Sequence, residues 1–456
     1  MQNKTLITTL LLSLLFIKAN IAQTDISSEQ VKSGWNFGGL PVVAYDSDLG
    51  FQYGALLNIF NYGDGSRYPD FDHNLYVEWS RFTKGSGINR IFFDSKQLIP
   101  GIRFTTDLSY LTDGTYDFFG FNGYESVYNS EWSEDISRVF YKYDRELFRF
   151  SIDLQGKLPM ENFGWAAGVG IYNFDIGSVN IDNLNEDRDA NDPDRLPDIP
   201  GLYDHYINWG IISNKEANGG LATYLKAGIV YDTRDFEPNP TKGIWTEAVF
   251  TYAPSFLGIE KDFEHVKFSL THRQYFTLIQ KKLSFAYRLG YQDTVFGSVP
   301  FYLQQNLTTL ILRGSTSEGL GGGKSLRGIV RNRVVGDGIA YGNLELRWKF
   351  VRFQLLNQNF YLSLNTFVDG GQVVTPVKIK TKTDDIDWDN YNWNSEGRTF
   401  SENDFFREDS ESLHMSYGAG LRIVMNQNFI VAIDHGRPFS EKDGSSGTYI
   451  GLNFLF

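Results

Sequence analysis

Apolar and polar residues alternate with a period of two in many segments of this chain, and this alternation restricts its fold more than any other feature. Over 343–350 the apolar residues are Leu344, Leu346, Trp348 and Phe350, and the polar residues between them are Asn343, Glu345, Arg347 and Lys349. Successive side chains of a β-strand point to opposite faces of the sheet, so the pattern predicts strands with one apolar and one polar face. At the end of the sequence, Ile450, Leu452, Phe454 and Phe456 are expected to share the apolar face of a final strand that carries a C-terminal aromatic signal.

These strands are expected to cross a membrane. A membrane-spanning helix needs about 20 mostly apolar residues in a row, and no segment after residue 22 offers such a run. The chain nevertheless has 37 Phe, 26 Tyr and 9 Trp residues, which suits strands that face lipid on one side and a wet interior on the other. We therefore predict an all-β fold, a transmembrane antiparallel β-barrel of about sixteen strands. A water-soluble antiparallel sandwich would also alternate and is the competing interpretation.

The expected strands are joined by connections of very unequal length. The strands are expected at 41–47, 50–60, 74–83, 88–96, 102–110, 139–157, 163–175, 221–233, 243–255, 263–277, 282–294, 339–350, 359–373, 413–425, 428–437 and 447–456. The long connections, at 111–138, 176–220, 295–338 and 374–412, would all lie at one end of the barrel. In membrane barrels the long loops face the cell exterior and the short turns face the periplasm.

The N-terminal segment has the features of a secretory signal. Lys4 precedes an apolar run from Leu6 to Ile17, and a cleavage site fits after Ala22. The expected organisation is a signal peptide at 1–22, a short periplasmic segment at 23–39 and the barrel at 40–456. Secretion would place the protein in the outer membrane of a Gram-negative bacterium, in contact with outer-membrane lipid.

Composition excludes several classes of function. The chain has no cysteine, so disulfides, thiolate metal sites and cysteine nucleophiles are unavailable. The net charge of -13 argues against a nucleic-acid partner. Acidic residues gather in the expected outer loops 181–204 and 374–412, where we interpret them mostly as solvated faces, and no metal or cofactor is expected. Calcium binding by these carboxylates is the alternative, although their spacing matches no EF-hand loop.

Three motifs resemble signatures of one family of barrels. Leu326-Arg327-Gly328-Ile329 is followed by Gly342-Asn343-Leu344-Glu345-Leu346-Arg347, then by Phe367-Val368-Asp369-Gly370-Gly371, and Tyr231-Asp232-Thr233-Arg234-Asp235 precedes them. In this order and spacing they resemble the BamA/TamA-like outer-membrane protein superfamily, also called the bacterial surface antigen family. The resemblance covers the whole expected barrel and is densest over 221–456. It departs at Ile329, where the family usually has an aromatic residue, and in lacking the periplasmic POTRA repeats.

The resemblance implies a loop folded into the barrel lumen. In such a barrel the loop carrying Leu326, Arg327, Gly328 and Ile329 would turn inward, and Arg327 would meet Asp369 on the barrel wall. Gly370 and Glu345 belong to the same wall motifs. A guanidinium and a carboxylate can form a bidentate, charge-assisted contact there. A solvated Arg327 is the alternative.

The resemblance also implies a non-enzymatic role in outer-membrane biogenesis. The chain would assist the insertion or translocation of unfolded barrel clients, with separate periplasmic or lipoprotein partners in place of POTRA domains. The expected first strand is short and begins at Pro41, which predicts a weak seam between the first and last strands.

Other functions remain open from the sequence. One is a gated or porin-like channel, and another is a surface scaffold, for which the aromatic segment 116–121 would suit a binding interface or equally pack the barrel mouth. A barrel hydrolase could use the pair Asp434-His435, but no G-x-S-x-G motif accompanies it. We therefore expect no enzymatic activity and no catalytic residues.

Overall fold

The computed structural model describes residues 29–46, 50–308, 319–388 and 400–456. The predicted signal peptide at 1–22 lies outside the described residues. Among the described helices, none is long and apolar enough to cross a membrane.

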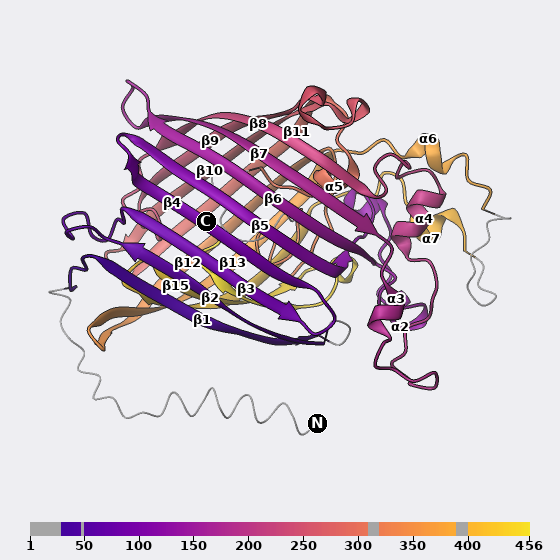
Figure 1. The fold of residues 1–456 in the computed structure, drawn as a ribbon, viewed down its shortest axis with the longest axis horizontal. Coiled ribbons are helices and arrows are strands. Elements are labelled where there is room, and N and C mark those ends of the chain that lie inside the picture. Colours follow the sequence, from indigo (N-terminus) through magenta and orange to yellow (C-terminus); the bar gives the residue numbers. More distant parts are fainter. Residues whose placement is uncertain (1–28, 47–49, 309–318, 389–399) are drawn as a thin grey trace.

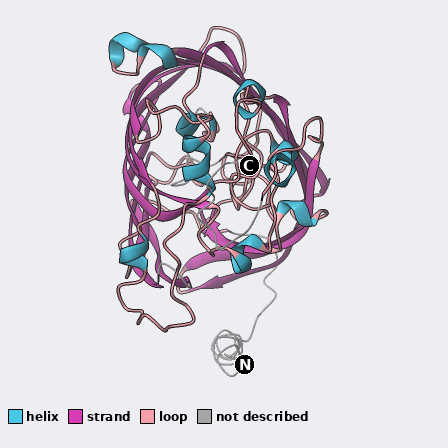
Figure 2. Ribbon diagram, turned by 90° about the vertical axis from the view of Figure 1, so that its right-hand side faces the viewer, coloured by secondary structure: helices cyan, strands magenta, loops and turns pink. Residues whose placement is uncertain are grey.

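Sixteen antiparallel strands form one sheet whose neighbours follow the order of the sequence, as predicted (Figure 1). Viewed along its axis, the sheet curls around an interior that loops occupy (Figure 2). The strands are β1 Trp35–Asp46, β2 Gly50–Asn61, β3 His73–Phe82, β4 Gly87–Ile99, β5 Ile102–Asp117, β6 Lys142–Lys157, β7 Phe163–Gly177, β8 Gly219–Asp232, β9 Gly243–Ala253, β10 His265–Ile279, β11 Leu283–Gly297, β12 Gly338–Leu355, β13 Gln358–Thr375, β14 His414–Met425, β15 Phe429–Pro438 and β16 Gly447–Leu452.

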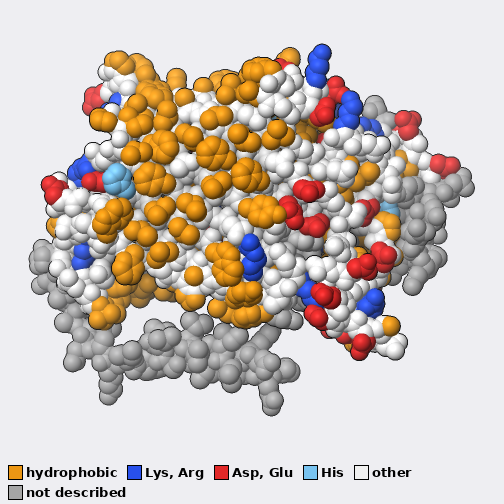
Figure 3. Space-filling model, viewed as in Figure 1, with side chains coloured by type: hydrophobic (Ala, Val, Ile, Leu, Met, Phe, Trp, Pro, Cys, Tyr) orange, Lys and Arg blue, Asp and Glu red, His pale blue; other side chains and the backbone are white. Residues whose placement is uncertain are grey.

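The outer face of the sheet carries the apolar half of each alternation. Large apolar side chains stay exposed there, and they form a broad band in Figure 3. Examples from successive strands are Trp79, Ile91, Leu108, Phe148, Ile171, Leu225, Phe250, Leu270, Leu289, Leu344 and Leu364. Their sequence neighbours point inward, and many of these are buried polar residues. An apolar band outside and a polar interior are what a membrane-spanning barrel requires.

The first strand differs from its prediction. It begins at Trp35 instead of Pro41, so it has 12 residues and Pro41 lies in its interior. Gly38 and Gly39 hide the alternation in the sequence, because glycine adds no side chain to either face. Proline is tolerated in a strand at the edge of a sheet, where its missing N–H can face away from the partner strand.

The last strand is shorter than predicted. It ends at Leu452, and Asn453 follows with a φ of 70°, which turns the chain out of the sheet. Asparagine adopts this left-handed conformation more readily than most residues. Phe454 and Phe456 therefore do not continue the apolar face begun by Ile450. They are 6% and 8% exposed and lie inside the barrel.

The long connections gather at one end of the barrel and carry the helical segments (Figure 1). These are η1 Gly123–Glu125, α2 Trp132–Asp135, α3 Ile181–Leu184, α4 Leu202–Asn208, η2 Ser255–Leu257, η3 Lys261–Phe263, α5 Phe301–Gln304, α6 Lys380–Thr383, α7 Glu402–Phe405 and η4 Glu441–Asp443. The largest apolar cluster also lies at this end. We call it the mouth cluster, and its members include Phe118, Phe121, Tyr143, Tyr203, Tyr206, Trp209, Phe301 and Phe405.

The mouth cluster decides between two interpretations of the aromatic segment 116–121. Phe118, Phe119 and Phe121 are at most 5% exposed, and the Phe118 ring meets Tyr206 edge to face with ring centres 5.0 Å apart. The segment therefore packs the barrel mouth, and these three rings are not available as a binding surface.

A buried histidine makes the mouth cluster sensitive to acid. His205 on α4 is stacked on Trp209, and burial lowers its pKa from 6.5 to about 4. The folded state thus binds this proton less readily than the unfolded state. The neutral, buried His205 therefore stabilises the fold fully above pH 6.5. As the pH falls toward 4, the free energy of unfolding decreases, by about 3 kcal/mol in all.

We expect hydrogen exchange of the peptide 202–212 to accelerate as the pH is lowered through this range, after correction for intrinsic exchange rates. The variant His205→Phe keeps the ring packing and should remove the dependence. His435→Phe changes an exposed histidine and should keep it. An unchanged pH profile in His205→Phe would show that another group is responsible.

Candidate functional site: the lumen loop and the seam

The loop at 319–337, here called the lumen loop, holds a fully buried arginine against the barrel wall. The Arg327 Nε and Nη2 atoms donate to the two carboxylate oxygens of Asp369 on β13 at 2.9 and 3.0 Å. The backbone N–H of Arg327 donates to the same carboxylate at 3.0 Å, and the guanidinium lies 3.6 Å from the centre of the Phe367 ring. The bidentate contact between Arg327 and Asp369 is thus present.

A second carboxylate continues the contact toward the end of the chain. Arg327 Nη1 donates to Glu345 on β12 at 2.6 Å, and the other oxygen of Glu345 accepts from Arg347 Nε at 2.7 Å. Arg347 Nη2 then donates to the main-chain oxygen of Phe456 at 2.8 Å. All three charged side chains are fully buried. One run of charge-assisted hydrogen bonds therefore links the lumen loop to the last residue of the sequence.

The aromatic rings that leave the sheet after β16 sit on these cations. The Arg347 guanidinium lies 4.5 Å from the Phe454 ring centre and 4.9 Å from the Phe456 ring centre. Arg422 on β14 lies 5.2 Å from Phe454 and forms a bidentate pair with Asp434 on β15 at 2.8 and 2.9 Å. Cation–π contacts gain strength where water is excluded, so these contacts hold residues 453–456 inside the barrel.

Glycine brings the lumen loop against the last strands. Gly328 has a φ of 94°, and a Cβ atom there would lie 2.5 Å from the backbone nitrogen of Arg437 on β15. Its N–H donates to the Tyr449 hydroxyl on β16 at 3.0 Å. Leu326 and Ile329 are buried in one apolar cluster with Ile339, Tyr341 and Val373. At Gly370 the three atoms nearest to an added Cβ belong to His414, Met415 and Leu413, at the start of β14 and just before it.

The two ends of the sheet meet in a seam, which we define as the contact of β1 and β2 with β14, β15 and β16. Alternation places Phe429 and Met425 on the outward face of the last strands, beside Leu452. These residues pack with Leu40, Leu56 and Phe60 from the inward face of the first hairpin. The first hairpin therefore laps over the outer face of the last strands, and the described contacts across the seam are side-chain contacts.

The short-turn end of the seam also carries polar contacts. The Asn428 side chain donates to the Tyr62 hydroxyl at 3.0 Å and to the carbonyl of Pro69 at 2.6 Å. The backbone of Gln30 exchanges two hydrogen bonds with the Asn359 side chain at 2.8 and 3.1 Å. The segment before β1 and the turn after β2 are thus fastened to turns of the last strands.

A glycine determines how closely the two sheet ends approach. A Cβ atom at Gly38 would lie 2.5 Å from the Phe429 ring. We expect Gly38→Ala to lower the free energy of unfolding by about 1–3 kcal/mol, because the added methyl group would overlap the Phe429 ring and force the two strands or the ring to move. Adding Phe429→Ala should recover part of the loss. Gly39→Ala is the matched control, since its nearest atom is 3.3 Å away. Equal losses in the two glycine variants would contradict this picture of the seam.

Within the described residues, two other candidates from the sequence do not form sites. Asp434 faces inward and pairs with Arg422, whereas His435 is exposed and bonds to Thr448 at 2.8 Å, because neighbours on a strand point to opposite faces. Asp434 therefore does not orient His435 for catalysis. Among the described residues of the acidic loops and elsewhere, no group of three or more His, Asp or Glu side chains is placed to hold a metal ion.

Sequence reasoning missed the roles of Arg347, Arg422 and Asp434. All three stand on the polar faces of strands that were identified, so their inward orientation was predictable. The contacts of the two arginines with Phe454 and Phe456 were not predictable, because these depend on the chain leaving the sheet at Asn453.

Comparison with known proteins agrees with this architecture. The family model of the Omp85 superfamily domain matches residues 91–456. Among solved structures, CdiB from Escherichia coli matches with a TM-score of 0.51 and 13% identity, over 92% of this chain and 62% of that one. BamA from Haemophilus ducreyi lacking POTRA domains 1–3 matches with a TM-score of 0.49 and 16% identity, over 93% of this chain and 71% of that one. No curated protein sequence matches significantly.

Proposed function

The chain belongs to the Omp85 superfamily of outer-membrane barrels, and on that premise we propose that it assists the assembly or translocation of other outer-membrane proteins together with separate periplasmic partners. The observation that carries the proposal is the construction of the seam. β16 pairs with β15 over 6 residues, and the residues after it leave the wall. Among the described residues β1 and β16 are not paired, so side-chain contacts close the seam in place of a strand ladder.

The seam offers a route for strands of a client. Separating β1 and β2 from the last strands would expose the free edge of β1, which could pair with an incoming strand, because an edge strand presents unpaired N–H and C=O groups. The side-chain packing across the seam would be broken in this step, and the sixteen-stranded ladder would stay intact.

Periplasmic partners would act at the short-turn end. The described residues before β1, 29–34, lie against the turns of the last strands. A partner that displaced this segment would also loosen the fastening across the seam. We propose a non-enzymatic role, since Asp434 pairs with Arg422 and does not orient His435 as a catalytic dyad would require.

The test is the folding rate of an unfolded client barrel in liposomes that contain this protein, with and without a periplasmic extract, while ion flux is recorded. The proposal expects faster client folding with low flux, at least when the extract is present. Phe429→Ala should accelerate client folding further by loosening the seam, whereas Phe353→Ala, an aromatic truncation on β12, should not. Unchanged client folding in both conditions would refute the proposal. High flux in that case would favour a channel, and low flux a surface scaffold.

A further inference from the structure

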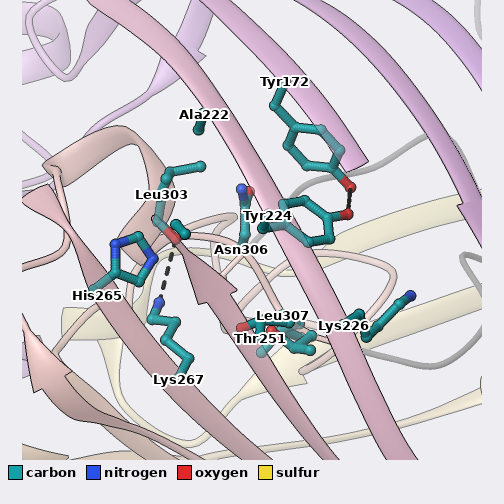
Figure 4. A pocket seen from close by; sticks show the side chains of 12 residues that line it. Tyr172, Ala222, Tyr224, Lys226, Thr251, His265, Lys267, Leu303, Asn306 and Leu307 are labelled. Atoms are coloured by element: carbon teal, nitrogen blue, oxygen red, sulfur yellow. Dashed lines mark hydrogen bonds between the residues drawn. The ribbon is translucent and has the colours of Figure 1, made fainter. Parts of the chain in front are cut away.

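A cavity inside the barrel, away from the seam, is lined by a buried cation that forms no direct ion pair among the described residues (Figure 4). The cavity has a volume of about 70 Å³. It lies between the inner face of β7, β8, β9 and β10 and the segment 303–308, which leads toward the lumen loop. At roughly 10–15 Å³ for each water-sized position, this space accommodates a small molecule of several heavy atoms.

Lys267 on β10 is the buried cation. Its side chain is 4% exposed, and its ammonium makes one long hydrogen bond, to the carbonyl of Leu303 at 3.4 Å. An ammonium has three donors, so this contact leaves it poorly satisfied. Lys267 has no ion pair within the part of the chain that the structure describes. Lys226, on the same cavity, pairs with Asp153 at 2.6 Å. The carboxylates of Asp337 and Asp293 act on Lys267 without forming an ion pair with it, and an anion in the cavity would give the buried ammonium a direct partner.

Two further polar groups face the cavity with unused hydrogen-bonding capacity. The Tyr172 hydroxyl accepts from Tyr224 at 2.9 Å, and its own proton has no acceptor among the described residues. The Oδ1 atom of Asn306 is buried and has no hydrogen-bond partner among the described residues. The amide can turn over to present its NH₂ group. Lys267 and Asn306 can therefore both donate to one ligand, whereas the Tyr172 hydroxyl lies farther from Lys267, next to that of Tyr224 (Figure 4).

The remaining wall of the cavity is partly apolar. Leu303 and Leu307 line it from the segment 303–308, and Ala222 and Ala253 line it from the barrel wall. A strongly hydrated inorganic anion would gain nothing from these side chains, whereas a short hydrocarbon tail would bury apolar surface against them.

We propose that this cavity is a binding site for a small carboxylate with a short aliphatic tail. The carboxylate accepts hydrogen bonds from Lys267 and Asn306, and the tail packs on Leu303 and Leu307. Because the ligand touches both β10 and the segment 303–308, its binding fastens the start of the lumen-loop connection to the barrel wall.

Calorimetric titration of the purified barrel in detergent with sodium propionate, at constant ionic strength, tests the proposal. The wild-type barrel should bind propionate saturably, with a rise in melting temperature. Lys267→Met should weaken binding at least tenfold. Asn306→Asp should weaken it equally, because it places a fixed carboxylate in the same cavity while Lys267 remains. Lys281→Met, in the exposed turn between β10 and β11, is the matched control and should bind as the wild type does.

Formate, phosphate and chloride identify the ligand class. Propionate should bind several-fold more tightly than formate, since formate has no tail. The proposal is overturned by absence of saturable propionate binding, by equal binding in the wild type, Lys267→Met and Asn306→Asp, or by phosphate or chloride binding as tightly as propionate. If Lys267→Met does not fold, Asn306→Asp alone decides, because it retains the lysine.

Discussion

Replacing Arg327 with alanine is expected to lower the free energy of unfolding by about 3–5 kcal/mol. The arginine supplies the cation for Asp369 and shares Glu345 with Arg347, and these carboxylates are fully buried. Without the guanidinium, Asp369 would be a buried charge without a cation, and the lumen loop would lose its strongest attachment. Tryptophan fluorescence during denaturant unfolding in detergent measures the effect.

A lysine at position 327 separates the effect of the bidentate hydrogen bonds from the effect of the positive charge. Arg327→Lys keeps the positive charge but cannot donate to both carboxylates in a bidentate manner, so we expect an intermediate loss. Arg138→Ala removes an arginine from a half-exposed ion pair with Asp194, 3.6 Å long, and should cost about 1 kcal/mol or less. Similar losses in Arg327→Ala and Arg138→Ala would contradict the assignment of Arg327 as the anchor of the loop.

The partner variant provides an independent measure. Asp369→Ala should also destabilise the barrel, and the double variant should cost less than the sum of the two single variants, because each removes the same contact. We further expect both single variants to raise ion conductance in planar bilayers, since the lumen loop would be free to leave the wall. Additive losses together with unchanged conductance would show that Arg327 and Asp369 act separately.

The sequence predicted the architecture well because strands leave a local signal. Alternation identified each strand of the sheet, and the predicted boundaries differ most at the end of β5, the start of β1, the end of β12 and the end of β16. At β1, Gly38 and Gly39 contribute no side chain to the pattern. At β16, Phe454 and Phe456 continue the alternation of Ile450 and Leu452, yet the chain turns inward. The rings contact cations on β12 and β14, and a contact between segments so far apart in the sequence leaves no local pattern.

The candidate site was predicted in part, from the resemblance to a family and not from alternation. The contact of Arg327 with Asp369 followed from the resemblance to a family, and periodicity alone gave only the inward orientation of Asp369. The lapped seam was not predictable, because side chains on the inward face of β1 and β2 and on the outward face of β15 look the same in sequence. The cavity beside Lys267 also depends on where the segment 303–308 folds back.

The link between the lumen loop and the end of the chain leads to the second large effect. Arg347 lies between Glu345 and the main-chain oxygen of Phe456, and its guanidinium contacts both aromatic rings that leave the sheet. Arg347→Met removes the cation while keeping much of the side-chain volume. We expect a loss of about 3–5 kcal/mol in the free energy of unfolding.

This variant should act on the seam as well as on stability. Without Arg347, residues 453–456 lose their hydrogen bond inside the barrel, so hydrogen exchange of the peptide 447–456 should accelerate more than that of the peptides covering β5 to β8. Arg352→Met, on the same strand, removes an arginine that bonds to the carbonyl of Lys281 in a turn and should leave this peptide unchanged. If Arg347→Met accelerated exchange uniformly over all strands, Arg347 would be a general stabilising residue. A local effect would instead establish that the lumen loop and the seam are coupled through Glu345 and Arg347, so that movement of one changes the stability of the other.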